Sequence, residues 1–278
     1  GWELSVPYIE RRYQPCYYDD EGSRKPGSAY NSDLCWGMDN AYLSFGQHSG
    51  ELVRDGASNV WRLRDDPGWK IEHHTGAPND DSNGEYWILR MQDGTRYYFG
   101  WGVPAAHWTN PKRTNSVWKA FVFGDDQGEP CYSATLAYAY CHQGWRWNLD
   151  LVIDPNGNFT TYTYAQENSQ YAINGDQSRK AAYTRGGYLT QIDYGFRGGE
   201  DRDASAVRVE FTTTGRCREA LSGDPCPGMG SANASSFPDV PVDLLCDPNC
   251  ESAQSFFTGR RLDTITTKVR NGSSYVPV

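Results

Sequence analysis

The sequence predicts an all-β protein, built from antiparallel meander sheets with disulfide-stapled loops. The apolar content is concentrated in aromatic residues, with 19 Tyr, 10 Trp and 10 Phe among 278 residues, and aromatic side chains favour strands over helices. Short segments alternate polar and apolar residues between turns rich in Gly and Pro, which is typical of strands in a meander. Eight cysteines fall in polar loops. We expect a single β-rich domain over residues 1–278.

The first half of the chain predicts two groups of strands. Four nearly alternating segments predict a meander. They are Tyr42–Phe45, Glu51–Arg54, Val60–Leu63 and Trp69–Glu72. The segments Glu85–Met91 and Thr95–Phe99 flank Asp93-Gly94, and Asp-Gly between two such runs is a strong hairpin signal. The stretch Trp101–Ser116 contains two prolines and predicts a surface excursion before the strand Val117–Phe123.

The second half of the chain repeats this pattern. Trp145–Ile153 and Phe159–Tyr164 flank the turn Asp154–Asn158 and predict a second hairpin. Ala134–Tyr140 mixes residues that favour helix with residues that favour sheet, so both a short helix and a strand stay open there. The polar stretch Ala165–Arg185 separates the hairpin from the next strands. Those strands are expected at Gly187–Tyr194, Ala206–Phe211 and Arg261–Val269.

The cysteines predict disulfides rather than a zinc site. They are Cys16, Cys35, Cys131, Cys141, Cys217, Cys226, Cys246 and Cys250. Zinc sites favour close Cys-x-x-Cys or Cys/His pairs, which the chain lacks. Local pairing joins the first cysteine to the second and the third to the fourth, while the last four, in a cysteine-rich loop at 215–256, allow three connectivities. Disulfides persist in oxidising compartments, so we expect a secreted, extracellular protein.

Charge and hydropathy exclude two classes of partner. The net charge is -9 and the basic residues are scattered among carboxylates, so we expect no nucleic-acid partner. No apolar run approaches the roughly 18 to 20 residues of a spanning helix, so we expect no membrane insertion. The chain opens on Gly1-Trp2-Glu3-Leu4, without Met or a signal peptide. We therefore expect a fragment of a longer chain.

Two recurring sequence patterns and the opening motif resemble a known family. A turn followed by an aromatic strand occurs at Asp93–Phe99 and Asp154–Tyr164, and Leu-x-x-Ile strands occur at Gly187–Ile192 and Arg261–Ile265. These patterns resemble the tyrosine-aspartate (YD) repeat of the RHS family of secreted bacterial proteins. The opening Gly1–Arg11 resembles the Gly-Trp-x-Leu-x-x-Pro-x-Ile-x-Arg entry of RHS and SpvB-like regions.

The resemblance implies a segment of a β-sheet shell that encloses a C-terminal toxin. The implied function is that of a non-enzymatic scaffold, and the implied partners are the remainder of a larger RHS-type chain or its effector. RHS proteins that release their toxin cleave themselves near a paired Asp-Pro-x-Gly motif. This chain has one such motif, Asp154–Gly157, so we expect neither self-cleavage nor a toxin domain in it.

One loop has the composition of a calcium site. Asn79, Asp81, Asn83 and Glu85 alternate oxygen ligands around a glycine, and calcium prefers carboxylate and amide oxygens. The full EF-hand spacing is missing, so a plain loop before a strand is the alternative interpretation. We expect no other cofactor.

Tryptophans give an alternative function, a secreted carbohydrate-binding β-module. Exposed indoles can stack on sugar rings, and the candidates are Trp101, Trp108, Trp145 and Trp147. Strand alternation predicts that Trp145 and Trp147 share one face of their strand, with Arg146 on the other. The competing interpretation is that these side chains pack inside the sheet.

No motif supports an enzyme. The common nucleophile, phosphate-binding and zinc-protease signatures are all missing from the sequence. Glycoside hydrolysis needs two carboxylates that converge, and the adjacent pairs of carboxylates lie in expected turns, as at Asp65-Asp66 and Asp80-Asp81. We therefore expect no enzymatic activity, with a glycoside-active enzyme as the unsupported alternative.

Overall fold

The computed structural model confirms the all-β class. It describes residues 5–19, 32–102, 112–197, 200, 205–218 and 226–278. Within these ranges the short 3₁₀ helices are η1 (Cys16–Tyr18), η3 (Leu136–Tyr138), η4 (Ile173–Gly175), η6 (Ser231–Ser236) and η7 (Val242–Leu244). No helix in the described part of the chain is long and apolar enough to cross a membrane.

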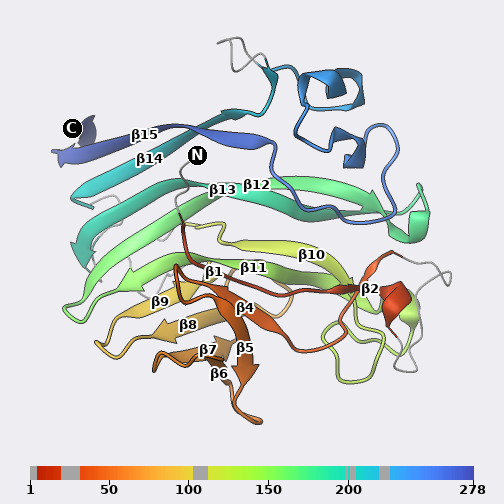
Figure 1. Ribbon diagram of the computed structural model, residues 1–278, viewed down its shortest axis with the longest axis horizontal. Coiled ribbons are helices and arrows are strands. Elements are labelled where there is room, and N and C mark those ends of the chain that lie inside the picture. Colours follow the sequence, from red (N-terminus) through yellow and green to blue (C-terminus); the bar gives the residue numbers. More distant parts are fainter. Residues whose placement is uncertain (1–4, 20–31, 103–111, 198–199, 201–204, 219–225) are drawn as a thin grey trace.

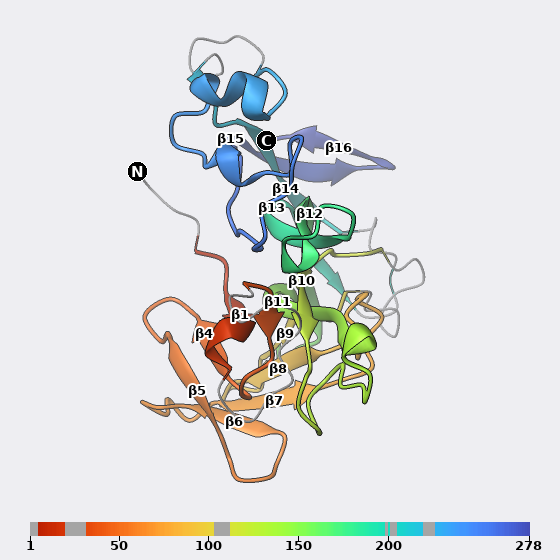
Figure 2. The same cartoon turned by 90° about the vertical axis from the view of Figure 1, so that its right-hand side faces the viewer.

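Eight strands close into a ring at one end of the molecule (Figure 2). In spatial order they are β1 (Tyr8–Glu10), β4 (Ala41–Ser44), β5 (Gly50–Arg54), β6 (Val60–Leu63), β7 (Lys70–His74), β8 (Tyr86–Arg90), β9 (Arg96–Phe99) and β11 (Tyr140–Ile153). The strand β1 closes the ring, because it pairs with β4 on one side and with β11 on the other. The predicted meander and the Asp-Gly hairpin are both confirmed within it.

Alternating side chains fill the ring. Ile9 and Leu43 are fully buried, as are Trp87, Phe99 and Trp147. The neighbouring residues along each strand face outward, which is the period of two that the sequence showed. The ring therefore has a packed aromatic and aliphatic core.

A second set of strands extends from the ring as a long antiparallel strip (Figure 1). Its main strands are β12 (Asn158–Ala172), β13 (Lys180–Arg197), β14 (Val207–Gly215), β15 (Arg260–Asn271) and β16 (Ser274–Pro277). The strand β11 belongs to both parts, because its end pairs with β9 and with β12. Three further strands lie beside β11. They are β10 (Val117–Phe123), which pairs with β11, then β3 (Leu34–Cys35) and β2 (Gln14–Pro15).

The polar stretch Ala165–Arg185 is mostly strand, which corrects the sequence interpretation. The strands β12 and β13 pair continuously through it, from Asn158 opposite Arg197 to Ala172 opposite Lys180. Tyr171 and Tyr183 provide the missing apolar anchor, since both are buried in a cluster with Phe121. Within Ala134–Tyr140, where both a short helix and a strand stayed open, the structure has the short 3₁₀ helix η3, and β11 begins at Tyr140.

All eight cysteines form disulfides between sequence neighbours. The pairs are Cys16–Cys35, Cys131–Cys141, Cys217–Cys226 and Cys246–Cys250. The first two are those that local pairing predicted, and the last two select one of three open connectivities. The described part of the cysteine-rich loop carries η6 and η7 over a small core of its own, and it lies at the end of the molecule opposite the ring (Figure 2).

Candidate functional site

The strip presents an apolar face. Tyr194, Val207, Val269 and Val276 stand in register across β13, β14, β15 and β16, so their side chains share one face of the sheet. Ile265 lies on the same face, opposite Phe211 of β14. Tyr194, Ile265, Val269 and Val276 are between 37% and 41% exposed. Contiguous apolar surface of this kind marks an interaction site in soluble proteins.

The opposite face of the strip carries charge. Arg208 Nε lies 2.7 Å from Asp193 Oδ1, and the Arg208 guanidinium lies 4.0 Å from the centre of the Tyr275 ring. Lys268 Nζ lies 2.6 Å from Glu210 Oε2 on the same face. The Lys268 and Glu210 pair is partly exposed, whereas Asp193 is fully buried beneath Arg208. The two faces of the strip therefore differ in chemistry.

A cavity of about 400 Å³ lies between the ring and the strip. On one side its walls come from the start of β1 and from β10 and β11. On the other side they come from β13, β14 and β15 of the strip. Aromatic and cationic side chains line it together: Tyr8, Trp118, Arg146, Tyr188, Phe211, Arg260 and Arg261. None of its described lining residues is acidic, although the whole chain carries a net charge of -9.

Arg146 reaches this cavity because of an irregularity in β11. The register between β10 and β11 shifts at Trp118, so that Trp145 has no partner of its own in the ladder. The guanidinium of Arg146 lies 3.9 Å from the centre of the Tyr8 ring, and its Nη2 lies 3.0 Å from Glu10 Oε2. A planar cation held over an aromatic ring and beside one carboxylate is fixed in orientation.

The bulge corrects the predicted arrangement of the tryptophans. Trp147 is fully buried in the ring core against Trp87, whereas Trp145 packs against Trp118 and Phe256 on the strip side. The two indoles therefore do not share a face, because a β-bulge interrupts strict alternation. Trp145 also donates its indole hydrogen bond to the carbonyl of Thr184. A buried Trp147 presents no ring face to a sugar.

Trp101 is a described candidate with a partly exposed indole, as is Trp145. Trp101 is half-buried and stacks at 4.8 Å on Tyr98 and at 6.1 Å on Tyr86. Trp108 lies outside the described residues. The rest of the predicted surface excursion is described only at its two ends.

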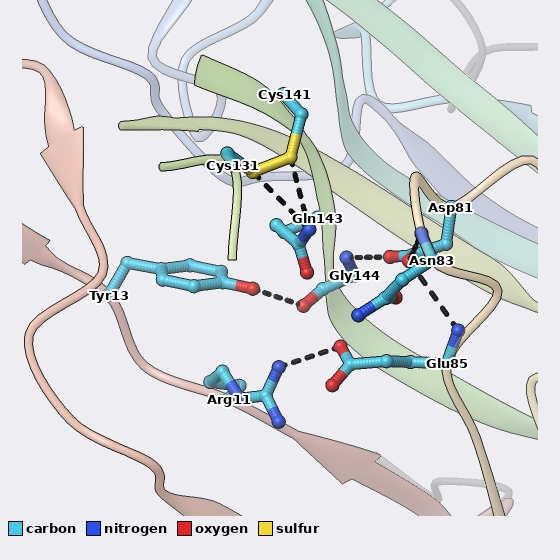
Figure 3. The surroundings of a disulfide bond; sticks show 9 residues. All are labelled: Arg11, Tyr13, Asp81, Asn83, Glu85, Cys131, Cys141, Gln143 and Gly144. Atoms are coloured by element: carbon cyan, nitrogen blue, oxygen red, sulfur yellow. Dashed lines mark hydrogen bonds and ion pairs between the residues drawn. A yellow bond between two sulfur atoms is a disulfide. The ribbon is translucent and has the colours of Figure 1, made fainter. Parts of the chain in front are cut away.

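A buried ion pair joins the opening motif to the predicted calcium loop (Figure 3). Arg11 Nη1 lies 2.7 Å from Glu85 Oε2, and both side chains are almost fully buried. His73 shares a 2.9 Å hydrogen bond with the other carboxylate oxygen. Burial alone would raise the pKa of Glu85, but the Arg11 charge and the His73 contact outweigh it and lower the pKa to about 2. Glu85 is therefore a structural anion.

The other oxygens of the calcium candidate bind backbone groups. Asp81 accepts hydrogen bonds from the backbone N–H of Asn83 with one oxygen and of Gly144 with the other (Figure 3). Asn79 Oδ1 accepts a hydrogen bond from the backbone N–H of Asp81, while Asn79 Nδ2 donates to the carbonyls of Glu85 and Gly100. Burial, together with the charge of Glu85, raises the pKa of Asp81 to about 6. Calcium would have to displace these contacts, so the geometry favours a plain loop, and calcium binding stays a prediction.

A second acidic cluster lies beside a disulfide. Ligand atoms of Asp19, Cys35 and Asp125 lie within 4.8 Å of one another, but Cys35 is bonded to Cys16, which leaves two carboxylates. Burial and neighbouring carboxylates raise the pKa of Asp125 to about 6 and that of Glu129 to about 7. We assign no ligand to this cluster.

Sequence reasoning missed the arginine-lined cavity. Arg146 was placed on the face opposite its tryptophans, and Arg261 was considered only as the start of an expected strand. Arg146 lies on β11, whereas Arg260 and Arg261 lie on β15, more than a hundred positions further along the chain. No local pattern brings them together, because the cavity depends on how the strip returns past the ring.

Comparison with known proteins gives structural matches only. No family model matches the chain, and no curated protein matches it. A crystal structure of TcdB2-TccC3 is similar over the whole chain, with 13% identity and a TM-score of 0.46. The N-terminal domain of effector protein SpvB from Salmonella typhimurium strain LT2 is 14% identical with a TM-score of 0.47. The opening motif resembles SpvB-like regions in sequence.

The matched structures differ greatly in length from this chain. The chain covers 12% of the TcdB2-TccC3 chain and 81% of the SpvB chain. A structure of the Photorhabdus luminescens Tc holotoxin pore also matches, with 13% identity, a TM-score of 0.43 and 12% of that chain covered.

Proposed function

We propose that the chain is a wall segment of an RHS-type, toxin-associated shell that holds an effector polypeptide against its apolar face. It acts as a secreted scaffold without enzymatic activity. The observation that carries the proposal is the row of half-exposed apolar side chains across β13 to β16, with two ion pairs on the opposite face. The YD-like turns and the opening motif support the same function.

A face of this kind suits a partner that is not compactly folded. Tyr194, Ile265 and Val269 offer apolar contact without a shaped pocket, and such contact is non-directional. The four disulfides of the described chain suit an extracellular scaffold, because they cross-link the chain and persist in an oxidising compartment.

Site-specific crosslinking in the full-length natural protein tests the proposal. A photo-reactive phenylalanine at Ile265 or Val269 should crosslink to the effector part of the protein. The same residue at Thr212, which is exposed on the charged face, is the matched control. Equal crosslinking from both faces, or none from Ile265 and Val269, would contradict the proposal.

The carbohydrate-binding alternative rests on Trp101. Its stack with Tyr86 and Tyr98 is half-buried at the ring surface, and indole rings stack on sugars. A glycan array with the wild-type chain and with Trp101→Ala tests it. The alternative requires a glycan that the wild type binds and the variant does not.

A further inference from the structure

The strip divides between β13 and β14. Ladder pairs join these strands only from Gln191–Tyr194 to Val207–Glu210. Beyond this point β14 stays paired with β15, and β13 stays paired with β12. The pair β14 and β15 turns away from β12 and β13 toward the end that carries the cysteine-rich loop (Figure 1).

Two strand edges therefore face each other without pairing. No described ladder pair joins Gly186–Thr190 of β13 to Phe211–Gly215 of β14. The arginine-lined cavity lies here, since Gly187, Leu189 and Phe211 are among its walls. A second cavity, of about 520 Å³, shares Tyr188, Thr213 and Arg260 with the first. The division in the sheet is thus an open space rather than a packed seam.

The charge of the first cavity has one sign. Arg146, Arg260 and Arg261 line the first cavity, and none of its described lining residues is acidic. Arg146 is paired with Glu10, whereas Arg261 donates a long hydrogen bond of 3.4 Å to the carbonyl of Gly215. Arg260 is exposed. Two arginines on β15 are therefore placed to receive an anionic group.

We propose that this division binds an extended peptide segment that carries carboxylate side chains. The peptide would add as a strand to the free edge of β13 or β14, the mode in which backbone hydrogen bonds give affinity. Its carboxylates would pair with Arg260 and Arg261, and its apolar side chains would contact Tyr188, Leu189 and Phe211. This inference rests on the proposed function, because it names the polypeptide chemistry that the apolar face would hold.

Fluorescence anisotropy with defined peptides tests the proposal on the chain itself. The probe is a fluorescein-labelled Thr-Glu-Val-Glu-Val-Glu-Thr, and its counterpart carries Lys in place of Glu. The double variant Arg260→Gln, Arg261→Gln should weaken binding of the Glu peptide about tenfold, the size expected when two partly exposed charge-assisted contacts are lost. The Lys peptide should not bind.

Matched controls separate this site from general electrostatics and from misfolding. Arg270→Gln removes one positive charge from an exposed position toward the other end of β15, outside the described lining of both cavities, and it should leave the affinity unchanged. A Glu peptide that is N-methylated at alternate residues keeps its charge but loses backbone donors, so it should not bind. Circular dichroism melting of each variant shows whether the fold is intact.

Three results would overturn the proposal. The first is equal affinity of the Glu and N-methylated peptides, which would mean a surface charge effect without strand addition. The second is an affinity unchanged by the loss of Arg260 and Arg261. The third is binding of decanoate but not of peptide, which would assign the cavity to small anionic amphiphiles. None of these results affects the crosslinking test, so the shell function can stand or fail separately.

Discussion

At Arg11 a completely buried guanidinium is stabilised by Glu85, by the more distant and partly exposed Asp39, and by two aromatic rings. The group pairs with Glu85 and lies 4.5 Å from the centre of Trp36 and 5.1 Å from that of Trp147. Since β1 closes the ring, Arg11 fixes the segment just after the closing strand to the loop before β8. The arginine at the end of the opening motif thus has a structural reason for its position.

Removal of Arg11 alone should therefore be costly. Arg11→Met leaves Glu85 buried without its main counter-charge, so we expect the free energy of unfolding to fall by about 3–5 kcal/mol. The double variant Arg11→Met, Glu85→Leu should lose less than the single variant, because no uncompensated charge remains. Urea denaturation at pH 7 measures both. A double variant less stable than Arg11→Met would contradict this assignment.

Asp150 is a buried carboxylate whose ionisation opposes folding. Its Oδ2 accepts hydrogen bonds from the backbone N–H of Gly102 and from the hydroxyls of Thr114 and Ser116. Burial outweighs these contacts and raises the pKa from 3.8 to about 6. The folded protein thus binds this proton more readily than the unfolded chain does.

The contribution of Asp150 to stability should decline as the pH rises. It is fully present below the unfolded pKa of 3.8 and is lost through the folded pKa of about 6. Relative to Asp150→Asn, the wild type should lose up to about 3 kcal/mol of unfolding free energy between pH 4 and pH 7, from the size of the shift. Parallel urea denaturation series of the two proteins give this difference, and a constant difference would rule the effect out.

At the scale of elements, β11 couples the two parts of the fold. Its first half pairs with β1 and β10, and its second half with β9 and β12. The bulge at Trp145 lets one strand direct Trp147 into the ring core and Trp145 toward the strip. One strand therefore sets the position of the cavity between ring and strip.

The disulfides should differ in their value to stability. Cys16 and Cys35 are separated by 19 residues and are fully buried, whereas Cys246 and Cys250 are separated by only 4. Loop entropy gives about 3 kcal/mol for the first pair and about 2 kcal/mol for the second. The paired Cys→Ser variants should follow this order in thermal melting, with a further loss at Cys16 and Cys35 from their packing with Phe121. The reverse order would contradict the chain-entropy account.

Local chemistry explains which elements the sequence could predict. The hairpin at Asp93-Gly94 and the turn at Asp154–Asn158 follow from turn residues with strands on both sides. The strands through Ala165–Arg185 were missed because most of their residues are polar and their buried apolar anchors, which include Tyr171 and Tyr183, are few. The closure of the ring by β1 was not predictable, since it depends on partners far along the chain.

At the scale of the whole molecule, apolar and charged side chains lie on different surfaces. The strip carries apolar side chains on one face and paired charges on the other. Three arginines line the cavity at the division of the sheet, in a chain that is acidic as a whole. Such segregation is consistent with one face in contact with a partner and the other in water.

The isolated chain should therefore expose a surface that a partner normally covers. We expect it to bind a hydrophobic dye and to self-associate, because its apolar face is contiguous. Ile265→Lys with Val269→Lys should reduce dye fluorescence to roughly half or less and favour the monomer, with a change in unfolding free energy near 0.5 kcal/mol, as is usual for exposed positions. Thr212→Lys with Thr264→Lys adds the same charge on the other face. This pair should leave dye fluorescence and self-association as in the wild type. If both lysine pairs reduced association equally, net charge rather than the apolar face would govern it.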